Sequence, residues 1–259
     1  MPGGLTYADP LLRGSEAQLG VTDRDWSADG QGALMLSSSY DQLPIWERLH
    51  QQYDPPTQRP SPATPLARSL ARRLAPSQNV LELGCGNGAD AAFLSRRGHT
   101  VIATDFSEYA IETARKIYQN SNLVFQAKDL RHPLDFDSST FNVVYARLSL
   151  HYFSDALTRA IVCEIGRVLV PGGQFLFMCK STQDPLCGKG DVIAPQIYCY
   201  EGHIRHFFDR SYTADLLSLD GFFKIRRLRL VEQSVYGFRS SVIVCLARRV
   251  GNYRQPRLI

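Results

Sequence analysis

Two apolar runs, one ending in a glycine-rich turn and the other in an acid, limit the folds open to this chain. The first runs from Val80 to Leu83 and continues into Gly84–Gly88, and the second ends at Asp105. A segment typical of a helix separates them. This order is typical of a βαβ unit that binds a nucleoside at the carboxyl ends of its parallel strands. We therefore predict that an adenosine-containing cofactor lies across Gly84–Gly88.

The centre of the chain alternates between strand-like and helix-like segments, which predicts an α/β fold. Ser107 is predicted to cap the second helix, with Glu108 in its first turn complementing the helix dipole. Strict alternation through five strands implies a buried parallel sheet with right-handed crossovers. Two further strand-like runs, 222–230 and 240–247, are expected to close the chain as an antiparallel pair. The predicted strands are 79–85, 100–105, 123–127, 141–145 and 174–179, and the predicted helices between them are 89–97, 107–118 and 157–169.

The remaining segments divide the chain into one large domain with additions. Residues 1–36 lack periodicity, contain several glycines and are interpreted as a weakly ordered extension, or as one ordered only by contact with a partner or ligand. Residues 37–250 are assigned to the main domain. Within it, residues 40–75 form a helical cap. Residues 180–208 are rich in glycine, proline and tyrosine and form a lid insertion, because the segment is too long for a simple connecting loop. Residues 251–259 are a tail.

Bulk properties set the broad class of the protein. The hydrophobic fraction is 44%, the charged fraction is 21%, and the net charge is +4. The basic residues are scattered except for pairs such as Arg226-Arg227, so charge does not predict a nucleic-acid partner. No apolar run approaches the ~20 residues that span a membrane. The six cysteines form no Cys-x-x-Cys pair. These features predict a cytoplasmic protein with reduced thiols and no membrane partner.

The glycine turn alone does not identify the nucleotide, because Ala89 also completes the looser dinucleotide fingerprint. Three further features separate the alternatives. Glu82 lies inside the first strand, where an acid is costly without a role. A second acid, Asp129, ends the third strand as Asp105 ends the second. A helix, a Pro-Gly-Gly turn and a strand follow the fourth strand over 168–175.

Taken together, these motifs resemble the class I S-adenosylmethionine-dependent methyltransferases over about residues 40–250. The family has a Rossmann-like, seven-stranded, mostly parallel sheet with helices on both faces and its last strand antiparallel. The resemblance implies S-adenosyl-L-methionine as cofactor, Asp105 at the ribose and Asp129 at the adenine. Glu82 is expected either to organise the turn or to face the cofactor's ammonium group. The full set that the resemblance assigns to the cofactor is Trp46, Glu82, Gly84, Cys85, Gly86, Gly88, Asp105, Phe106, Asp129, Leu130 and Arg147.

Candidate catalytic residues follow the fourth strand, in the stretch 147–153. His151 is a candidate base near neutral pH, and the alternative is a histidine packed beside the cofactor or capping the next helix. Arg147 either pairs with an anionic acceptor or covers the edge of the sheet. Methyl transfer mainly requires alignment and exclusion of water, so no fixed triad is expected.

The lid contains a polar and aromatic cluster suited to an anionic or aromatic acceptor. His206 is a second catalytic candidate, and His203, Arg205 and Phe207 are candidate substrate-binding residues. The lid resembles those of small-molecule methyltransferases of the tellurite-resistance and thiopurine type; the alternative is a structured loop that anchors the last helix. The histidines with Cys187 and Cys199 have irregular spacing, so no metal site is predicted. Two more candidate substrate residues, Tyr40 and Tyr53, lie in the helical cap, which alternatively only packs on the sheet.

The sequence thus predicts a methyltransferase that modifies O, N or S of a small polar metabolite. RNA or protein acceptors are the alternative within the same chemistry. An NAD-linked oxidoreductase would need a Tyr-x-x-x-Lys pair after the fourth strand, and this stretch has none. A cofactor-binding regulatory protein without activity is a third alternative. The oligomeric state, monomer or homodimer, stays open.

Overall fold

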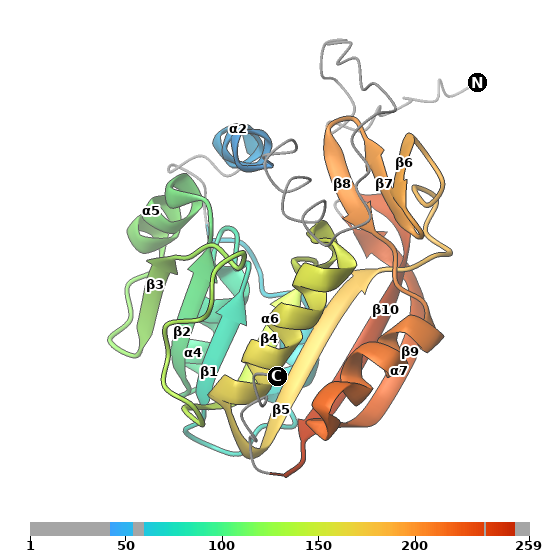
Figure 1. Cartoon of the computed structure of the whole chain (residues 1–259). Coiled ribbons are helices and arrows are strands. Elements are labelled where there is room, and N and C mark those ends of the chain that lie inside the picture. Colours follow the sequence, from blue (N-terminus) through green and yellow to red (C-terminus); the bar gives the residue numbers. More distant parts are fainter. Residues whose placement is uncertain (1–41, 54–59, 236, 252–259) are drawn as a thin grey trace, which may run out of the picture.

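The computed structural model describes residues 42–53, 60–235 and 237–251, and its centre is a seven-stranded sheet (Figure 1). The strand order is β3-β2-β1-β4-β5-β10-β9. Strand β10 runs antiparallel to both of its neighbours, and the other six strands are parallel to one another. The predicted Rossmann-like fold is confirmed. The strands are β1 Asn79–Leu83, β2 Thr100–Asp105, β3 Leu123–Ala127, β4 Phe141–Arg147, β5 Leu169–Lys180, β9 Phe223–Val235 and β10 Phe238–Arg249.

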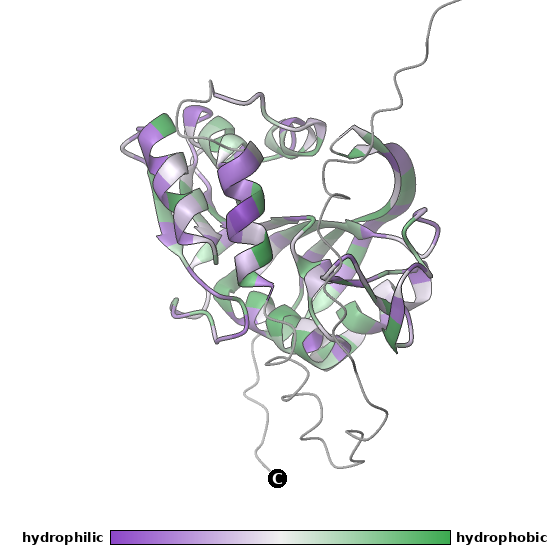
Figure 2. Ribbon diagram, turned by 90° about the horizontal axis from the view of Figure 1, so that it is seen from above, coloured by the Kyte–Doolittle hydropathy of each residue, from purple (hydrophilic) through white to green (hydrophobic). Residues whose placement is uncertain are grey.

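Helices cover both faces of the sheet, as the view from above shows (Figure 2). One face packs against α3 (Pro65–Ala71), α4 (Ala89–Arg96) and α5 (Glu108–Ile117). The other packs against α6 (Asp155–Val168) and α7 (Arg210–Ser218). Because both faces are covered, the central strands are mostly apolar rather than alternating, and β1 buries four consecutive residues from Val80, of which only Glu82 is polar. No helix in the described ranges is both long and apolar enough to cross a membrane.

The ends of the predicted elements are set by local capping. Ser107 accepts a hydrogen bond from the Ala110 amide and so caps α5, as predicted. Helix α6 begins earlier than expected because Ser154 caps it by accepting from the Leu157 amide. The Pro171-Gly172-Gly173 turn lies within β5 rather than before it. Its residues bulge out of the ladder, since Phe141 pairs with Leu169 and Val143 with Gln174.

The edge strand β9 accounts for the one dense basic stretch of the sequence. Its residues alternate between exposed and half-buried, and Arg226 and Arg227 are exposed. Charged side chains on an edge strand discourage pairing with other chains. The basic run therefore has a structural explanation that requires no nucleic acid.

The predicted lid insertion contains a small second sheet. Its strands are β6 (Asp191–Ala194), β7 (Ile197–Tyr200) and β8 (His203–His206), joined antiparallel. The preceding loop is held by Asp184, whose carboxylate accepts from Lys180 Nζ at 3.0 Å and from the Ser241 amide at 3.1 Å. The lid lies beyond the carboxyl ends of β4 and β5, near α2 (Leu43–Tyr53) in Figure 1.

The predicted extension 1–36 lies outside the described residues, as does the tail apart from Gly251. The predicted domain divisions stay predictions. Within the range 40–75 the structure has two helices, α2 and α3.

Candidate functional site

The glycine turn between β1 and α4 depends on glycine at three positions. Gly84, Gly86 and Gly88 have φ angles of 73°, 51° and 77°, in the left-handed region that other residues seldom adopt. The amides of Gly84 and Cys85 both donate to the Thr104 carbonyl, at 2.8 and 2.9 Å. The turn is therefore fixed to the end of β2, and α4 begins at the carboxyl edge of the sheet.

Close packing also excludes side chains from this turn. A Cβ at Gly84 would lie 2.5 Å from Ser149 Cβ, and Ser149 Oγ donates to the Leu83 carbonyl at 2.8 Å. A Cβ at Gly88 would lie 2.6 Å from the Phe125 ring. The turn is thus held from the ends of β2, β3 and β4 together.

Replacing Gly88 with alanine should lower the free energy of unfolding by about 2 kcal/mol. The left-handed backbone costs an alanine roughly 1 kcal/mol, and overpacking against Phe125 costs roughly 1 kcal/mol or more. Gly98→Ala is the matched control, because Gly98 has φ 85° but nothing within 4 Å of a Cβ. Denaturant unfolding of both variants measures the difference. If both variants lose the same free energy of unfolding, the Phe125 ring moves aside without an energetic cost.

Asp105 lies at the end of β2 with its carboxylate turned toward the glycine turn. It is 7% exposed, and it accepts from the Gly86 amide at 2.8 Å and the Ser107 amide at 3.1 Å. Burial raises the pKa of Asp105, while the charge of His50 and the amide hydrogen bonds oppose the rise. Two carboxylate oxygens hold about four lone pairs, so acceptor capacity remains for a ligand hydroxyl.

Glu82 contributes a second buried carboxylate beneath the turn. It is 3% exposed, and its Oε2 atom has no hydrogen-bond partner among the described residues. Burial and the neighbouring charge of Asp90 raise the pKa of Glu82 well above its usual value, and Arg147 opposes them. An unpartnered buried carboxylate oxygen is costly, which is typical of a position that meets a ligand.

Asp90, a residue that the sequence analysis missed, anchors α4 to the sheet. Its Oδ2 accepts from Tyr145 Oη at 2.8 Å and Thr64 Oγ1 at 2.7 Å, and its Oδ1 accepts from the Thr64 amide at 2.7 Å. In the sequence it is an acid in the first turn of a helix, indistinguishable from one that complements the helix dipole. Only the packing of α3 and β4 shows that it is buried.

Helix α2 lies over the glycine turn and links it to the lid. A Cβ at Gly86 would be 3.6 Å from His50 Cε1, and the rings of Trp46 and His50 are 5.9 Å apart. Trp46 also contacts Tyr152 at 5.0 Å and His203 at 5.5 Å between ring centroids. His50 was not predicted, although its spacing of four from Trp46 places both on one helix face.

Three histidines gather between β4 and the lid, and all are buried. His151 is 0% exposed, and both of its ring nitrogens lack hydrogen-bond partners among the described residues. Burial lowers the pKa of His151 well below its usual value, and burial lowers that of His203 to about 3 and that of His206 to about 4. All three are therefore uncharged at neutral pH, and within the described ranges each has at least one ring nitrogen without a hydrogen-bond partner.

Because these histidines are buried uncharged, we expect the folded protein to lose stability in acid. The variant His206→Gln should lose less. The pKa of His206 is near 6.5 in the unfolded chain and about 4 in the folded one, so only the unfolded state gains a proton as pH falls through this interval. By linkage this costs roughly 2 kcal/mol of folding stability between pH 7 and pH 5. Urea unfolding at both values should show the variant losing roughly 2 kcal/mol less than the parent. If the parent and the variant lose the same free energy of unfolding, the assignment to His206 is wrong. The contribution of Glu82 to the pH dependence is the same in both proteins and cancels in the comparison.

The other predicted cofactor residues lie around the same edge, with differences in detail. Asp129 pairs with Arg131 at 2.6 Å; burial alone would raise the pKa of Asp129, but Arg131 outweighs it and lowers that pKa. The Leu130 side chain is buried in the core, so only its backbone is left for a ligand. Phe106 is half-buried after β2. Cys85 is buried beside Asp105, and burial raises the pKa of its thiol, which makes it a poor nucleophile.

The predicted substrate residues divide into those of the lid and those of the cap. Arg205 is 7% exposed on β8, and Phe207 is 1% exposed and packs on Tyr198. Tyr53 ends α2, and Tyr40 lies outside the described residues. Among the described residues no three His, Cys, Asp or Glu side chains gather in a way that would hold a metal ion.

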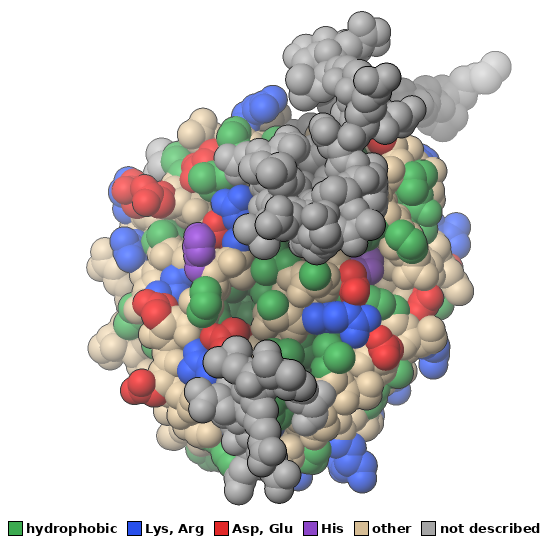
Figure 3. Space-filling model, viewed as in Figure 1, with side chains coloured by type: hydrophobic (Ala, Val, Ile, Leu, Met, Phe, Trp, Pro, Cys, Tyr) green, Lys and Arg blue, Asp and Glu red, His purple; other side chains and the backbone are tan. Residues whose placement is uncertain are grey.

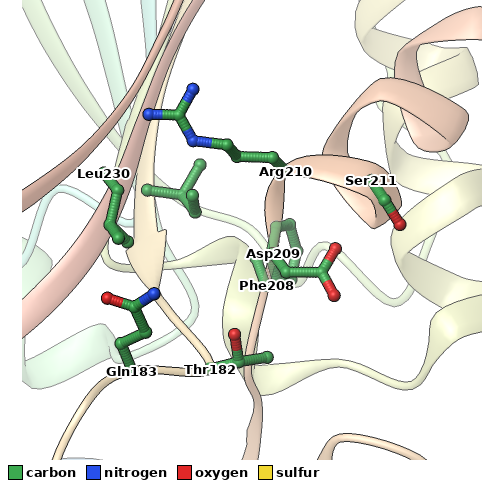
Figure 4. A pocket seen from close by; sticks show the side chains of 8 residues that line it. Thr182, Gln183, Phe208, Asp209, Arg210, Ser211 and Leu230 are labelled. Carbon is green, nitrogen blue, oxygen red and sulfur yellow. The ribbon is translucent and has the colours of Figure 1, made fainter.

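A cavity of about 290 Å³ lies elsewhere, between the loop after β5, the start of α7 and strands β9 and β10 (Figure 4). Gln183 and Leu230 lie on one side, Asp209 and Ser211 on the other, and Arg210 extends across it. None of the predicted site residues lines this cavity. It is therefore distinct from the glycine turn.

Comparison with known proteins agrees with the resemblance found in the sequence. Residues 80–173 match the family described as a methyltransferase domain. An uncharacterized methyltransferase of Synechocystis sp. is 32% identical over 102 residues, which are 39% of this chain and 47% of that protein. The methyltransferase domain occupies the βαβ units around the glycine turn, so the resemblance drawn from the sequence is confirmed.

Solved structures share the fold of this methyltransferase domain. One is an S-adenosylmethionine-dependent methyltransferase from Methanosarcina mazei, with a TM-score of 0.63, 21% identity and coverage of 73% of this chain and 99% of that one. Another is the Burkholderia thailandensis 1,6-didemethyltoxoflavin-N1-methyltransferase with bound 1,6-didemethyltoxoflavin and S-adenosylhomocysteine, with a TM-score of 0.62, 20% identity and coverage of 89% and 94%. The matches with curated relatives span about half of those relatives' length.

Proposed function

We propose that this protein is an S-adenosylmethionine-dependent methyltransferase acting on O, N or S of a small polar metabolite in the cytoplasm. The observation that carries the proposal is the glycine turn with two buried carboxylates, Asp105 and Glu82, placed under α2 at the carboxyl edge of the sheet. The methyltransferase domain family and the shared fold support the choice of cofactor.

The residues of the turn fit such a cofactor. Three glycines without Cβ atoms allow a ligand to approach the backbone closely. Asp105 has acceptor capacity for ribose hydroxyls, which a carboxylate binds in charge-assisted hydrogen bonds. The unpartnered Glu82 oxygen suits the ammonium of the amino-acid part, and Arg147 faces the same region. When bound, the cofactor supplies a methyl group on a sulfonium that is already activated.

The chain's own contribution is to position the acceptor and receive a proton where one is lost. His151 suits the second task, because it is uncharged and its unprotonated ring nitrogen can accept a hydrogen bond from an acceptor O–H or N–H. Tyr152 packs on His151, and Trp46 packs on Tyr152, so both rings help to exclude water. His206 donates to the Phe153 backbone and packs on Tyr212, which favours a positioning role over direct catalysis.

A small acceptor is preferred to RNA or protein because α2 and β8 enclose the edge of the sheet where the acceptor would lie. On the face in Figure 3 the lysine and arginine side chains are interspersed with acidic and apolar ones. That distribution does not suggest a phosphate-backbone surface. We expect no membrane partner; a monomer and a homodimer are both compatible with the proposal.

The test incubates the protein with methyl-labelled S-adenosylmethionine and a cell extract, and separates low-mass label from acid-precipitable label. Label in the low-mass fraction is expected. Label confined to the precipitate would replace the small acceptor with RNA or protein. Absence of transfer, together with calorimetric binding of S-adenosylhomocysteine, would indicate a cofactor-binding regulatory protein instead.

A further inference from the structure

Arg205 is a buried cation with no acidic partner in the part of the chain that the structure describes. The residue is 7% exposed, and among the described residues it makes one hydrogen bond, from Nη1 to the Tyr200 carbonyl at 3.4 Å. No Asp or Glu of the described residues lies within ion-pair distance of it. A buried charge without a partner costs several kcal/mol, so such a group is retained where a ligand supplies the opposite charge.

Three other partly buried cations have acidic partners. Lys180 pairs with Asp184 at 3.0 Å, Arg159 with Asp155 at 2.9 Å, and Arg167 with Glu164 at 2.8 Å. The buried Arg249 forms no ion pair with an acid among the described residues, but it donates to the Leu169 carbonyl and to Ser139 Oγ. Arg205 has a single long hydrogen bond among the described residues, so its charge is the less compensated of the two.

Residues with flat side chains neighbour Arg205 in the small sheet. Residues His203 and Phe207 are two positions away along the strand direction, so they lie on the same face, and Tyr198 is its ladder partner on β7. His203 in turn contacts Trp46 at 5.5 Å between ring centroids. A guanidinium among aromatic and imidazole rings matches a planar ligand that carries a carboxylate, because the guanidinium binds a carboxylate in a bidentate, coplanar fork.

The surrounding histidines do not neutralise Arg205. Its charge is one of the causes that lower the pKa values of His151 and His203, after burial in both cases. The carboxylates of Asp155 and Asp209 face His206, which lies on the opposite face of β8. The region around Arg205 and His151 thus has a positive charge and uncharged acceptors, and it needs an anion.

We propose that the methyl acceptor is a planar, ring-bearing carboxylate and that Arg205 binds its carboxylate group. This inference rests on the proposed function, since it assigns a substrate class to the same site. Aromatic side chains of β7, β8 and α2 hold the ring, and Arg205 sets its direction so that the rest of the acceptor faces the glycine turn.

Benzoate and benzamide test the inference, because they have the same shape and differ in charge. Titration calorimetry of the full chain with saturating S-adenosylhomocysteine should show benzoate binding at least 10-fold more tightly than benzamide. Arg205→Gln should weaken benzoate at least 10-fold and leave benzamide unchanged, and Arg205→Lys should fall between. Arg226→Gln is the matched control, since it removes an exposed arginine of the edge strand β9.

Several results would overturn the inference. They are equal binding of benzoate and benzamide by the parent protein, unchanged benzoate binding in Arg205→Gln, or no saturable benzoate binding up to ~20 mM. The parent comparison needs no variant, so a variant that fails to fold does not remove the test. Binding of S-adenosylhomocysteine is measured separately. If it binds and benzoate does not, only this inference fails; if it does not bind, the proposed function fails.

Discussion

Replacing His151 with glutamine should lower methyl transfer about 100-fold while leaving S-adenosylhomocysteine affinity unchanged. A positioned acid or base contributes about 10²–10⁴-fold to a rate. His151 is uncharged at neutral pH, fully buried and without hydrogen-bond partners for its ring nitrogens among the described residues. An uncharged imidazole has a nitrogen free to take the proton that the acceptor loses, whereas glutamine can fill its place but cannot take a proton at neutral pH.

The measurement is the rate of low-mass label formation at saturating methyl donor, with affinity followed by calorimetry. His99→Gln is the matched control, because His99 is 3% exposed and accepts from the Gln78 amide at the opposite end of β2. Its rate should equal that of the parent protein. A full rate in His151→Gln would mean that the enzyme works by alignment alone and that the acceptor loses its proton without help.

Replacing Asp105 with alanine should weaken S-adenosylhomocysteine binding by roughly 1.5–3 kcal/mol, or about 10–150-fold. The loss has two physical sources. One is the charge-assisted contact with the ribose hydroxyls, and the other is the support that the carboxylate gives to the Gly86 amide. The change should therefore also lower the melting temperature modestly.

A double comparison separates these two sources. Adenosine and 2′,3′-dideoxyadenosine are titrated against the parent protein and Asp105→Ala. If Asp105 binds the ribose, the parent should favour adenosine strongly and the variant should favour it little. If Asp105 only organises the turn, both nucleosides should lose affinity equally. Asp135→Ala is the control, because Asp135 is an exposed acid that pairs with Lys128.

The sequence predicted the sheet well because its signals there are local. The apolar runs from Val80 and from Thr100, the glycines between them and the cap at Ser107 all act over a few residues, and each was found where expected. The lid was predicted only as a segment. Its strands are short and obtain their stability from pairing with each other, which periodicity over four residues does not indicate.

The candidate site divides in the same way. Gly84, Gly86, Gly88 and Asp105 were found from spacing, because the chain itself brings the end of one strand beside the next. His50 and Asp90 were missed, because an ordinary helix residue and an ordinary first-turn acid give no sign of burial. Their positions depend on contacts with residues distant in the chain, such as Tyr145 for Asp90.

By itself, therefore, the sequence determined the α/β class, the cofactor turn and the acid at the end of β2, all of which follow from local backbone preferences and from the order of elements. Only the tertiary structure decided that α2 covers the turn, that His151, His203 and His206 are uncharged, and that Arg205 is buried with no acid paired to it among the described residues. The physical reason is that burial and charge pairing depend on what packs against a residue. Those neighbours come from elements far apart in the chain, whereas turns and caps depend on adjacent residues.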